Sequence, residues 1–290
     1  MTDHDNADTR QTGVSTILTE QEMAELRWAY KHLEHPSLAG RLSNVLALPI
    51  EEGIALLPKV WQKRLHKVAE KSICQSLTLA TGTIRQGESS AAHHLAHKFL
   101  AMGTGAVGGF FGPLTLLAEL PLTTTLMMRA IAAIARDEGE DLTLAEAKLA
   151  CVQVFALGGR TREDEAADLG YYGMRVTLGF YFERDILEFA ADASGPHIPA
   201  VIQIIRAIAA RFGVVISDKA AAQMVPIAGA VSGATLNLIF MNHYQNVARG
   251  HFIVRRLERE YDIETVRGVY ERIRDEEIET ETVFSPVDGW

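Results

Sequence analysis

Two long stretches without a charged residue constrain most strongly how this chain can fold. The first runs from Phe99 to Ala118 and the second from Ala220 to Asn242. Each is about as long as a bilayer-spanning helix, which needs roughly 20 apolar residues. The first, however, contains five glycines and Pro113, and the second contains Pro226 and Asn237, all of which weaken insertion. Three interpretations remain: buried core helices, helices that enter or lie on a membrane, and permanent membrane spans.

Both stretches carry small residues at a spacing that suits close helix packing. Glycines four positions apart form a flat strip on one helix face, so a second helix can approach closely. The pairs are Gly105 with Gly109, Gly108 with Gly112, and Gly229 with Gly233. We therefore expect two central Gly/Ala-rich apolar helices, at about 99–118 and 220–242.

The rest of the chain predicts an all-α fold. Aromatic residues make up only 7% of the sequence, and no run of alternating strand pattern occurs. Pro121 is expected to start a helix that ends near Gly139, and an Arg/Glu-rich helix is expected from about Ala248 to Glu277. The sequence thus predicts one compact multi-helix domain over 19–276, after a disordered lead-in at 1–18 and before an acidic tail at 277–290.

Two capping boxes are predicted at helix starts. Thr19 with Glu22, and Thr143 with Glu146, both match the T-x-x-E pattern in which each side chain hydrogen-bonds the other's backbone N–H group.

A basic amphipathic helix follows Pro58. Lysines four positions apart form one stripe, and Leu65 and Val68 lie on the other side. The membrane-surface candidates are Lys59, Trp61, Lys63, Lys67 and Lys71. The stripe is either a solvated helix face or a surface that adsorbs to anionic lipid, with the tryptophan at the interface. A weaker basic face is offered by the arginines at 249, 255, 256 and 259.

Several polar residues lie in mostly apolar surroundings. A buried charge needs a partner, because leaving it unpaired costs several kcal/mol. The members of this predicted polar cluster are Glu119, Arg129, Lys219, Asn237 and His243. They form a structural network, line a ligand or catalytic pocket, or reach solvent.

No motif identifies an enzyme class, a cofactor or a metal site. The pair His93 and His97 has metal-ligand spacing but no evident third ligand, so we predict no metal and no cofactor. The net charge of −9 argues against nucleic-acid binding. Cys74 and Cys151 form no CxxC pair, and no secretory signal is evident, which favours a cytoplasmic setting.

The C-terminal half resembles the EcsC family of bacterial proteins. The resemblance rests on KAAAQMVPIAGAVSGATLNLIF from Lys219, on HFIVRRL at 251–257, and on the earlier segments at 103–112, 118–142 and 154–159. It covers about 90–260 and implies a helical fold with membrane-linked work, but transfers no catalytic residues.

These observations lead to two hypotheses about function. The first is a membrane-associated binding or accessory protein, peripheral at the inner face of the membrane, whose partner is an anionic lipid surface or a membrane protein. The alternative is a hydrolase-type enzyme with a pocket around Arg129, Lys219 and His243. The sequence does not indicate the oligomeric state.

Overall fold

The computed structural model describes residues 17–34, 60, 63–73, 113–159, 170–179, 207–217 and 233–284. Its helices are α2 (Glu20–Glu34), α7 (Pro113–Asp137), α8 (Ala145–Leu157), α10 (Tyr171–Gly179), α13 (Gly233–Tyr261) and α14 (Ile263–Phe284), together with helical segments at 63–73 and 207–217. These described ranges contain no strand, so the predicted all-α class is confirmed. None of their helices has the length and apolar character needed to cross a bilayer.

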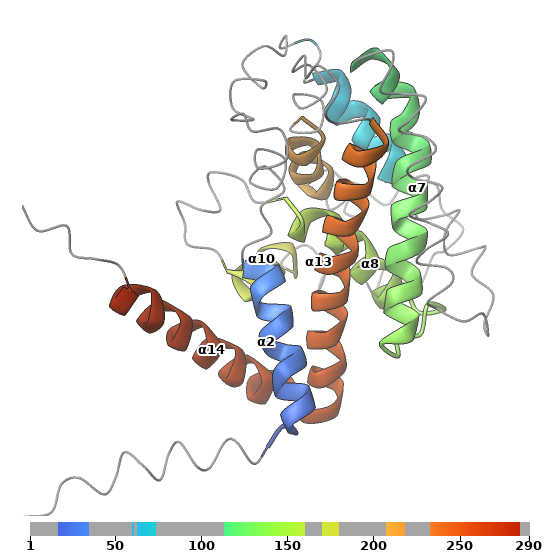
Figure 1. The fold of residues 1–290 in the computed structure, drawn as a ribbon. Helices are drawn as coiled ribbons and strands as arrows, with labels where there is room; N and C mark the ends of the chain where they lie inside the picture. Colours follow the sequence, from blue (N-terminus) through green and yellow to red (C-terminus); the bar gives the residue numbers. More distant parts are fainter. Residues whose placement is uncertain are drawn as a thin grey trace, which may run out of the picture.

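Helix α13 is the axis of the fold. Figure 1 shows it running between α2 and α7, and its principal packing partners are these two helices, followed by α14 and α8. Aromatic side chains join α13 to α8 and to segment 207–217. The ring centroid of Tyr244 on α13 lies 5.3 Å from that of Phe155 on α8 and 5.7 Å from that of Phe212, and Phe240 on α13 lies 6.3 Å from Phe212. All four side chains are fully buried and form the centre of the core.

Helix α2 begins as its sequence predicts. The backbone N–H of Thr19 donates to Glu22 Oε2 at 2.7 Å, and the backbone N–H of Glu22 donates to Thr19 Oγ1 at 3.2 Å. This reciprocal pair is a capping box. Behind it, Leu26, Ala29 and Leu33 recur at helical spacing and are buried, so α2 packs one apolar stripe against the core.

The predicted helix start at Pro121 is wrong. Helix α7 begins at Pro113 and continues through Pro121 to Asp137. A proline inside a helix removes one backbone hydrogen bond. Here residues after it, including Met127 and Ile131, are fully buried, and α7 packs against α13, so tertiary packing outweighs the local loss.

The predicted boundary between 242 and 248 is also wrong, because α13 is continuous from Gly233 to Tyr261. The polar run there suggested a break, yet His243, Tyr244 and Gln245 are buried. The helix ends instead at Asp262, whose φ is +77°, in the left-handed region. Its carboxylate accepts hydrogen bonds from the backbone N–H and hydroxyl of Thr265 and so caps α14.

The second predicted capping box does not form. Helix α8 begins at Ala145, and no side chain caps it. Thr143 instead donates from its backbone N–H and its hydroxyl to Asp141 Oδ1, at 2.9 and 2.7 Å. Glu146 is thereby left to pair with an arginine of α13, as described below.

Parts of the predicted central helices lie outside the described residues. This applies to 99–112 and 218–232, and so to Gly105, Gly108, Gly109, Gly112 and Gly229. Gly233 is the first residue of α13. The predicted acidic tail from Glu277 begins within α14, which continues to Phe284.

Candidate functional site

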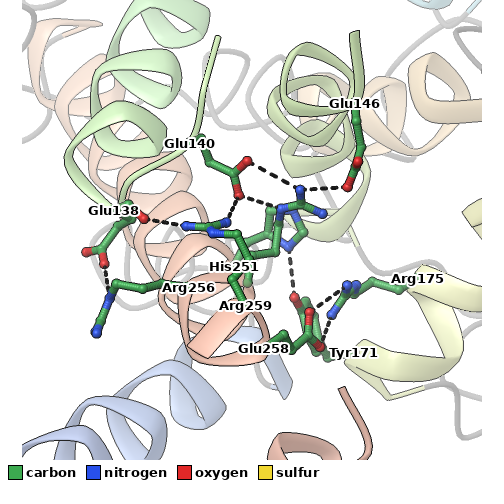
Figure 2. Close-up of polar contacts among 10 residues, drawn as sticks. Glu138, Glu140, Glu146, Tyr171, Arg175, His251, Arg256, Glu258 and Arg259 are labelled. Atoms are coloured by element: carbon green, nitrogen blue, oxygen red, sulfur yellow. Dashed lines mark hydrogen bonds and ion pairs between the residues drawn. The ribbon is translucent and has the colours of Figure 1, made fainter. Parts of the chain in front are cut away.

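The C-terminal half of α13 carries charged side chains that reach the connection between α7 and α8. Arg255 donates from Nε to Glu140 Oε1 at 2.7 Å and from Nη2 to Glu140 Oε2 at 3.3 Å. Its Nη2 also donates to Glu146 Oε1 at 3.1 Å (Figure 2). The side chains of Arg255 and Glu140 are only 14% and 6% exposed. This pair therefore lies where desolvation is expensive and mutual pairing is needed.

Two neighbouring arginines extend this network. Arg256 donates to Glu138 at 2.9 Å and to Glu25 of α2. Arg259 donates to Glu140 and, at 2.6 Å, to the backbone carbonyl of Glu138. One turn of α13 thus holds α2 and the end of α7 in place.

A second ion pair joins α13 to α10. Arg175 binds Glu258 through two parallel hydrogen bonds of 2.6 and 2.9 Å, and the hydroxyl of Tyr172 donates to Glu258 at 3.0 Å. The guanidinium of Arg175 lies 5.4 Å from the ring centre of Tyr171 and 5.5 Å from that of Tyr172. Bidentate pairing and ring contact together fix the orientation of this arginine.

A buried tyrosine–histidine pair lies beneath the charges. The Tyr171 hydroxyl and His251 Nδ1 are 2.9 Å apart, and both side chains are at most 1% exposed. Burial, with the charges of Arg175 and Arg255, holds the pKa of His251 well below its usual value, so the imidazole is neutral. Its Nε2 has no hydrogen-bond partner among the described residues. Complete burial makes this pair a structural element rather than an accessible catalytic dyad.

Helix α2 reaches the same region from the other side. Glu34, 7% exposed, accepts hydrogen bonds of 2.9 Å from the backbone N–H of Tyr171 and from the hydroxyl of Tyr270. One carboxylate thereby connects the end of α2 to the start of α10 and to α14.

The charges of the network surround a cavity of about 390 Å³. It is lined by Gly139, Glu140, Asp141, Leu144, Glu146, Ala147, Arg175, Arg255, Glu258, Arg259 and Ile263. Two apolar lining residues are well exposed, Leu144 at 56% and Ile263 at 55%. The cavity therefore combines a charged interior with apolar side chains open to solvent. Its volume is that of a small-ligand pocket.

Glu140 remains ionised inside this network of ion pairs. Burial opposes the charge on Glu140, but the hydrogen bonds and charges of Arg255 and Arg259 outweigh burial and lower the pKa of this carboxyl group. Nearby Cys151 is fully buried, and burial raises the pKa of its thiol, so it is a protonated core residue.

The structure brings together only some members of the predicted polar cluster. Asn237 Nδ2 donates to Glu119 Oε1 at 2.6 Å, and both side chains are buried between α7 and α13. His243 instead contacts the backbone carbonyl of Gly158, with its Nε2 2.7 Å from that oxygen. Arg129 is half-buried on α7, and Lys219 lies outside the described residues.

The predicted basic stripe is present along segment 63–73. Lys63, Lys67 and Lys71 are exposed, whereas Leu65 and Ile73 are buried in the core. Lys59 and Trp61 lie outside the described residues. By contrast, the weaker basic face on α13 is not available to lipid, because its arginines at 255, 256 and 259 pair with glutamates of the same chain.

Sequence reasoning missed Glu140, Arg175 and His251. The available signal was the alternation of arginines with buried apolar residues within HFIVRRLERE at 251–260, a composition that favours buried ion pairs over a solvated helix face. The partners could not be read from this segment alone, because they lie 80 to 119 positions away, from the Tyr171–His251 pair to the Arg259–Glu140 pair.

The fold and the site define an all-α protein with one long central helix. A largely buried network of arginine–glutamate ion pairs connects this helix to its neighbours, and an open cavity lies beside the network. The chain belongs to the EcsC protein family, which matches residues 20–257. The matched range includes α2 and segment 63–73, so it begins well before the predicted start at about 90. No curated protein and no solved structure matches the chain.

Proposed function

We propose that this protein is a peripheral membrane-binding or accessory protein that docks on anionic lipid at the inner face of the membrane. The observation that carries the proposal is the row of exposed cations on segment 63–73. Lys63, Lys67 and Lys71 lie four residues apart on one face, and the neighbouring Arg64 is exposed as well. Lysine and arginine near an anionic membrane surface each contribute about 1 kcal/mol of attraction.

The burial pattern determines how such docking would work. Leu65, Ala69 and Ile73 are at most 1% exposed, and the segment packs near 207–217, where His66 lies against Gly213. The apolar face is therefore already used by the core. Docking is electrostatic through the lysine face, without insertion of this helix into the hydrocarbon region.

Net charge makes the orientation of docking specific. The chain as a whole carries a formal charge of −9, so an anionic surface repels most of the molecule. Only a local concentration of cations overcomes this repulsion, and only over about one Debye length, roughly 8 Å at physiological salt. Attraction is thus expected to weaken steeply with added salt.

Flotation with liposomes tests the proposal. The purified full chain is mixed with phosphatidylcholine vesicles, with or without phosphatidylserine, at low and high salt. We expect flotation with the anionic vesicles at low salt, and its loss in the double variant Lys63→Glu, Lys67→Glu. The matched control is Arg272→Glu, Arg274→Glu, which makes the same change in net charge at exposed positions of α14.

The two double variants separate a specific face from general charge. If both lose flotation equally, net charge governs adsorption and segment 63–73 is not the docking face. If the unaltered protein stays at the bottom of the gradient in every condition, direct lipid binding is wrong.

A further inference from the structure

The cavity beside Arg255 holds charged groups of both signs with unused hydrogen-bonding capacity. Among its lining residues, Arg175, Arg255 and Arg259 oppose Glu140, Asp141, Glu146 and Glu258, a net formal charge of −1. Most of these groups form hydrogen bonds with one another. The capacity that remains decides what the cavity can bind.

Unused acceptors lie on the α8 side of the cavity. Glu146 is 64% exposed and accepts from Arg255 only through Oε1, so Oε2 makes no hydrogen bond to any described residue. Asp141 is exposed and directs Oδ1 to Thr143, which leaves Oδ2 similarly available within the described part of the chain. Two such carboxylate oxygens, on residues that line the same cavity, suit an ammonium group, which has three N–H donors and a positive charge.

Unused donors lie on α13. Arg255 uses Nε and Nη2 for its two glutamates, and its Nη1 has no hydrogen-bond partner among the described residues. Arg259 shares Glu140 with Arg255, and both guanidinium groups donate to Glu140 Oε1. A phosphate monoester has three terminal oxygens and a phosphodiester has two, so either can accept from both guanidinium groups together.

We propose that this cavity binds a compact zwitterion of the aminoalkyl phosphate class, with its ammonium on Glu146 and Asp141 and its phosphate on Arg255 and Arg259. A simple anion would face the carboxylates, and a simple cation would face the arginines. A ligand with both charges a few bonds apart satisfies both groups, and its carbon atoms lie against Leu144 and Ile263. The ligand is either a free aminoalkyl phosphate or the ethanolamine headgroup of a phospholipid.

The site is separate from the lysine face of segment 63–73. In Figure 1 that segment (cyan) lies towards the end of the molecule where α7 begins, whereas the cavity is lined by residues that follow the other end of α7 and by the end of α13. Binding at the cavity therefore neither requires nor excludes docking on anionic lipid.

Calorimetric titration with three probes tests the assignment. O-phosphoethanolamine carries both charges, whereas ethanolamine and inorganic phosphate each carry one. We expect O-phosphoethanolamine to bind at least about tenfold more tightly than either, because only this probe makes charge-assisted hydrogen bonds at both ends of the cavity. Equal affinity for phosphate alone, or no binding of O-phosphoethanolamine at millimolar concentration, would overturn the proposal.

A charge-neutralising variant tests the ammonium end. Glu146→Gln is expected to weaken O-phosphoethanolamine and ethanolamine binding by about tenfold, and to leave phosphate binding equal or stronger, since Arg255 loses a competing carboxylate. The matched control, Glu279→Gln at an exposed position of α14, should change nothing. An unchanged zwitterion affinity in Glu146→Gln would contradict the assigned orientation.

Methyl NMR on the unaltered chain locates the site without any substitution. The methyl signals of Leu144 and Ile263 should move on adding O-phosphoethanolamine, while that of Ile278, exposed further along α14, should not. Shifts at Ile278 alone would place binding elsewhere and reject the cavity. Competition with phosphatidylethanolamine in neutral vesicles then distinguishes the sources: displacement assigns the lipid headgroup, and retention assigns the free metabolite class.

Discussion

Arg255 of α13 donates two hydrogen bonds to the carboxylate of Glu140, which lies 115 positions earlier in the chain. Glu140 lies three residues after Asp137, the last residue of α7, so this contact ties the end of that helix to the central helix. Because the pair is mostly buried, either side chain alone would be a poorly solvated charge.

Neutralising Glu140 should therefore destabilise the fold. Glu140→Gln keeps the size of the side chain but leaves Arg255 and Arg259 without their shared anion, and we expect the free energy of unfolding to fall by about 3 kcal/mol. Denaturant unfolding followed by circular dichroism measures the change. The control is Glu271→Gln, which removes an exposed ion pair with Arg267 and should cost less than about 1 kcal/mol. Equal losses in both variants would show that burial does not strengthen the Glu140 pair.

Because Glu140 is ionised in the folded protein, the free energy of unfolding should depend on pH in the acidic range. The pKa of this carboxyl group in the folded protein lies below the ordinary value of 4.5, so the unfolded chain takes up the proton first as pH falls. The stabilisation is present above that ordinary value and is lost as pH falls through the lower folded-state pKa. Unfolding free energies measured from about pH 6 to about pH 3 should fall less steeply for Glu140→Gln than for the unaltered protein. Parallel curves would mean that Glu140 ionises as it does in the unfolded chain.

Because His251 is buried and neutral, the free energy of unfolding should also depend on pH in a second, higher pH range. The folded pKa is depressed by burial, so the unfolded chain binds this proton first below about pH 6.5. Its contribution to stability is complete above that pH and declines below it, by up to about 1.4 kcal/mol per pH unit. NMR of the imidazole nitrogens should show a neutral ring in the folded protein at about pH 5.5. A ring that is already protonated at about pH 6 would contradict the buried Tyr171 contact.

Two glycines offer a matched test of packing. A Cβ added at Gly158 would lie 2.6 Å from Tyr244 Cε1 and 3.2 Å from His243 Nε2, whereas a Cβ at Gly268 of α14 meets nothing within 4 Å. Gly158→Ala should therefore lower the melting temperature through a loss of about 1–3 kcal/mol. Gly268→Ala should raise stability by about 0.5–1 kcal/mol, because alanine is the better helix former. Thermal unfolding distinguishes them, and a tolerated alanine at 158 would show that Tyr244 can move aside.

Local features of the fold could be predicted from the sequence. The reciprocal contact of Thr19 and Glu22 spans three residues, and the outward lysines of segment 63–73 follow from helical periodicity alone. Each depends only on neighbours in sequence, so the pattern contains the information needed.

Features that depend on distant partners could not be predicted. Pro121 and the polar run at 242–246 are helix-ending signals by local rules, but packing of α7 against α13 overrides both. Likewise, arginines on a helix indicate a solvated or lipid-facing surface until Glu140, Glu146 and Glu138 are found beside them. Within the predicted polar cluster, Asn237 donates to Glu119 in apolar surroundings that provide few alternative partners, but the sequence pattern did not single out this pair.

The heaviest packing in the fold joins α2 to α13, elements whose closest ends are about 200 residues apart in the chain. During synthesis α2 leaves the ribosome first, carrying the apolar stripe of Leu26, Ala29 and Leu33 with no α13 to cover it. At a synthesis rate of about 5–20 residues per second, α13 follows α2 by on the order of ten seconds or longer. The core can therefore close only after α13 has been synthesised, and until then the apolar stripe of α2 is open to contacts with other chains.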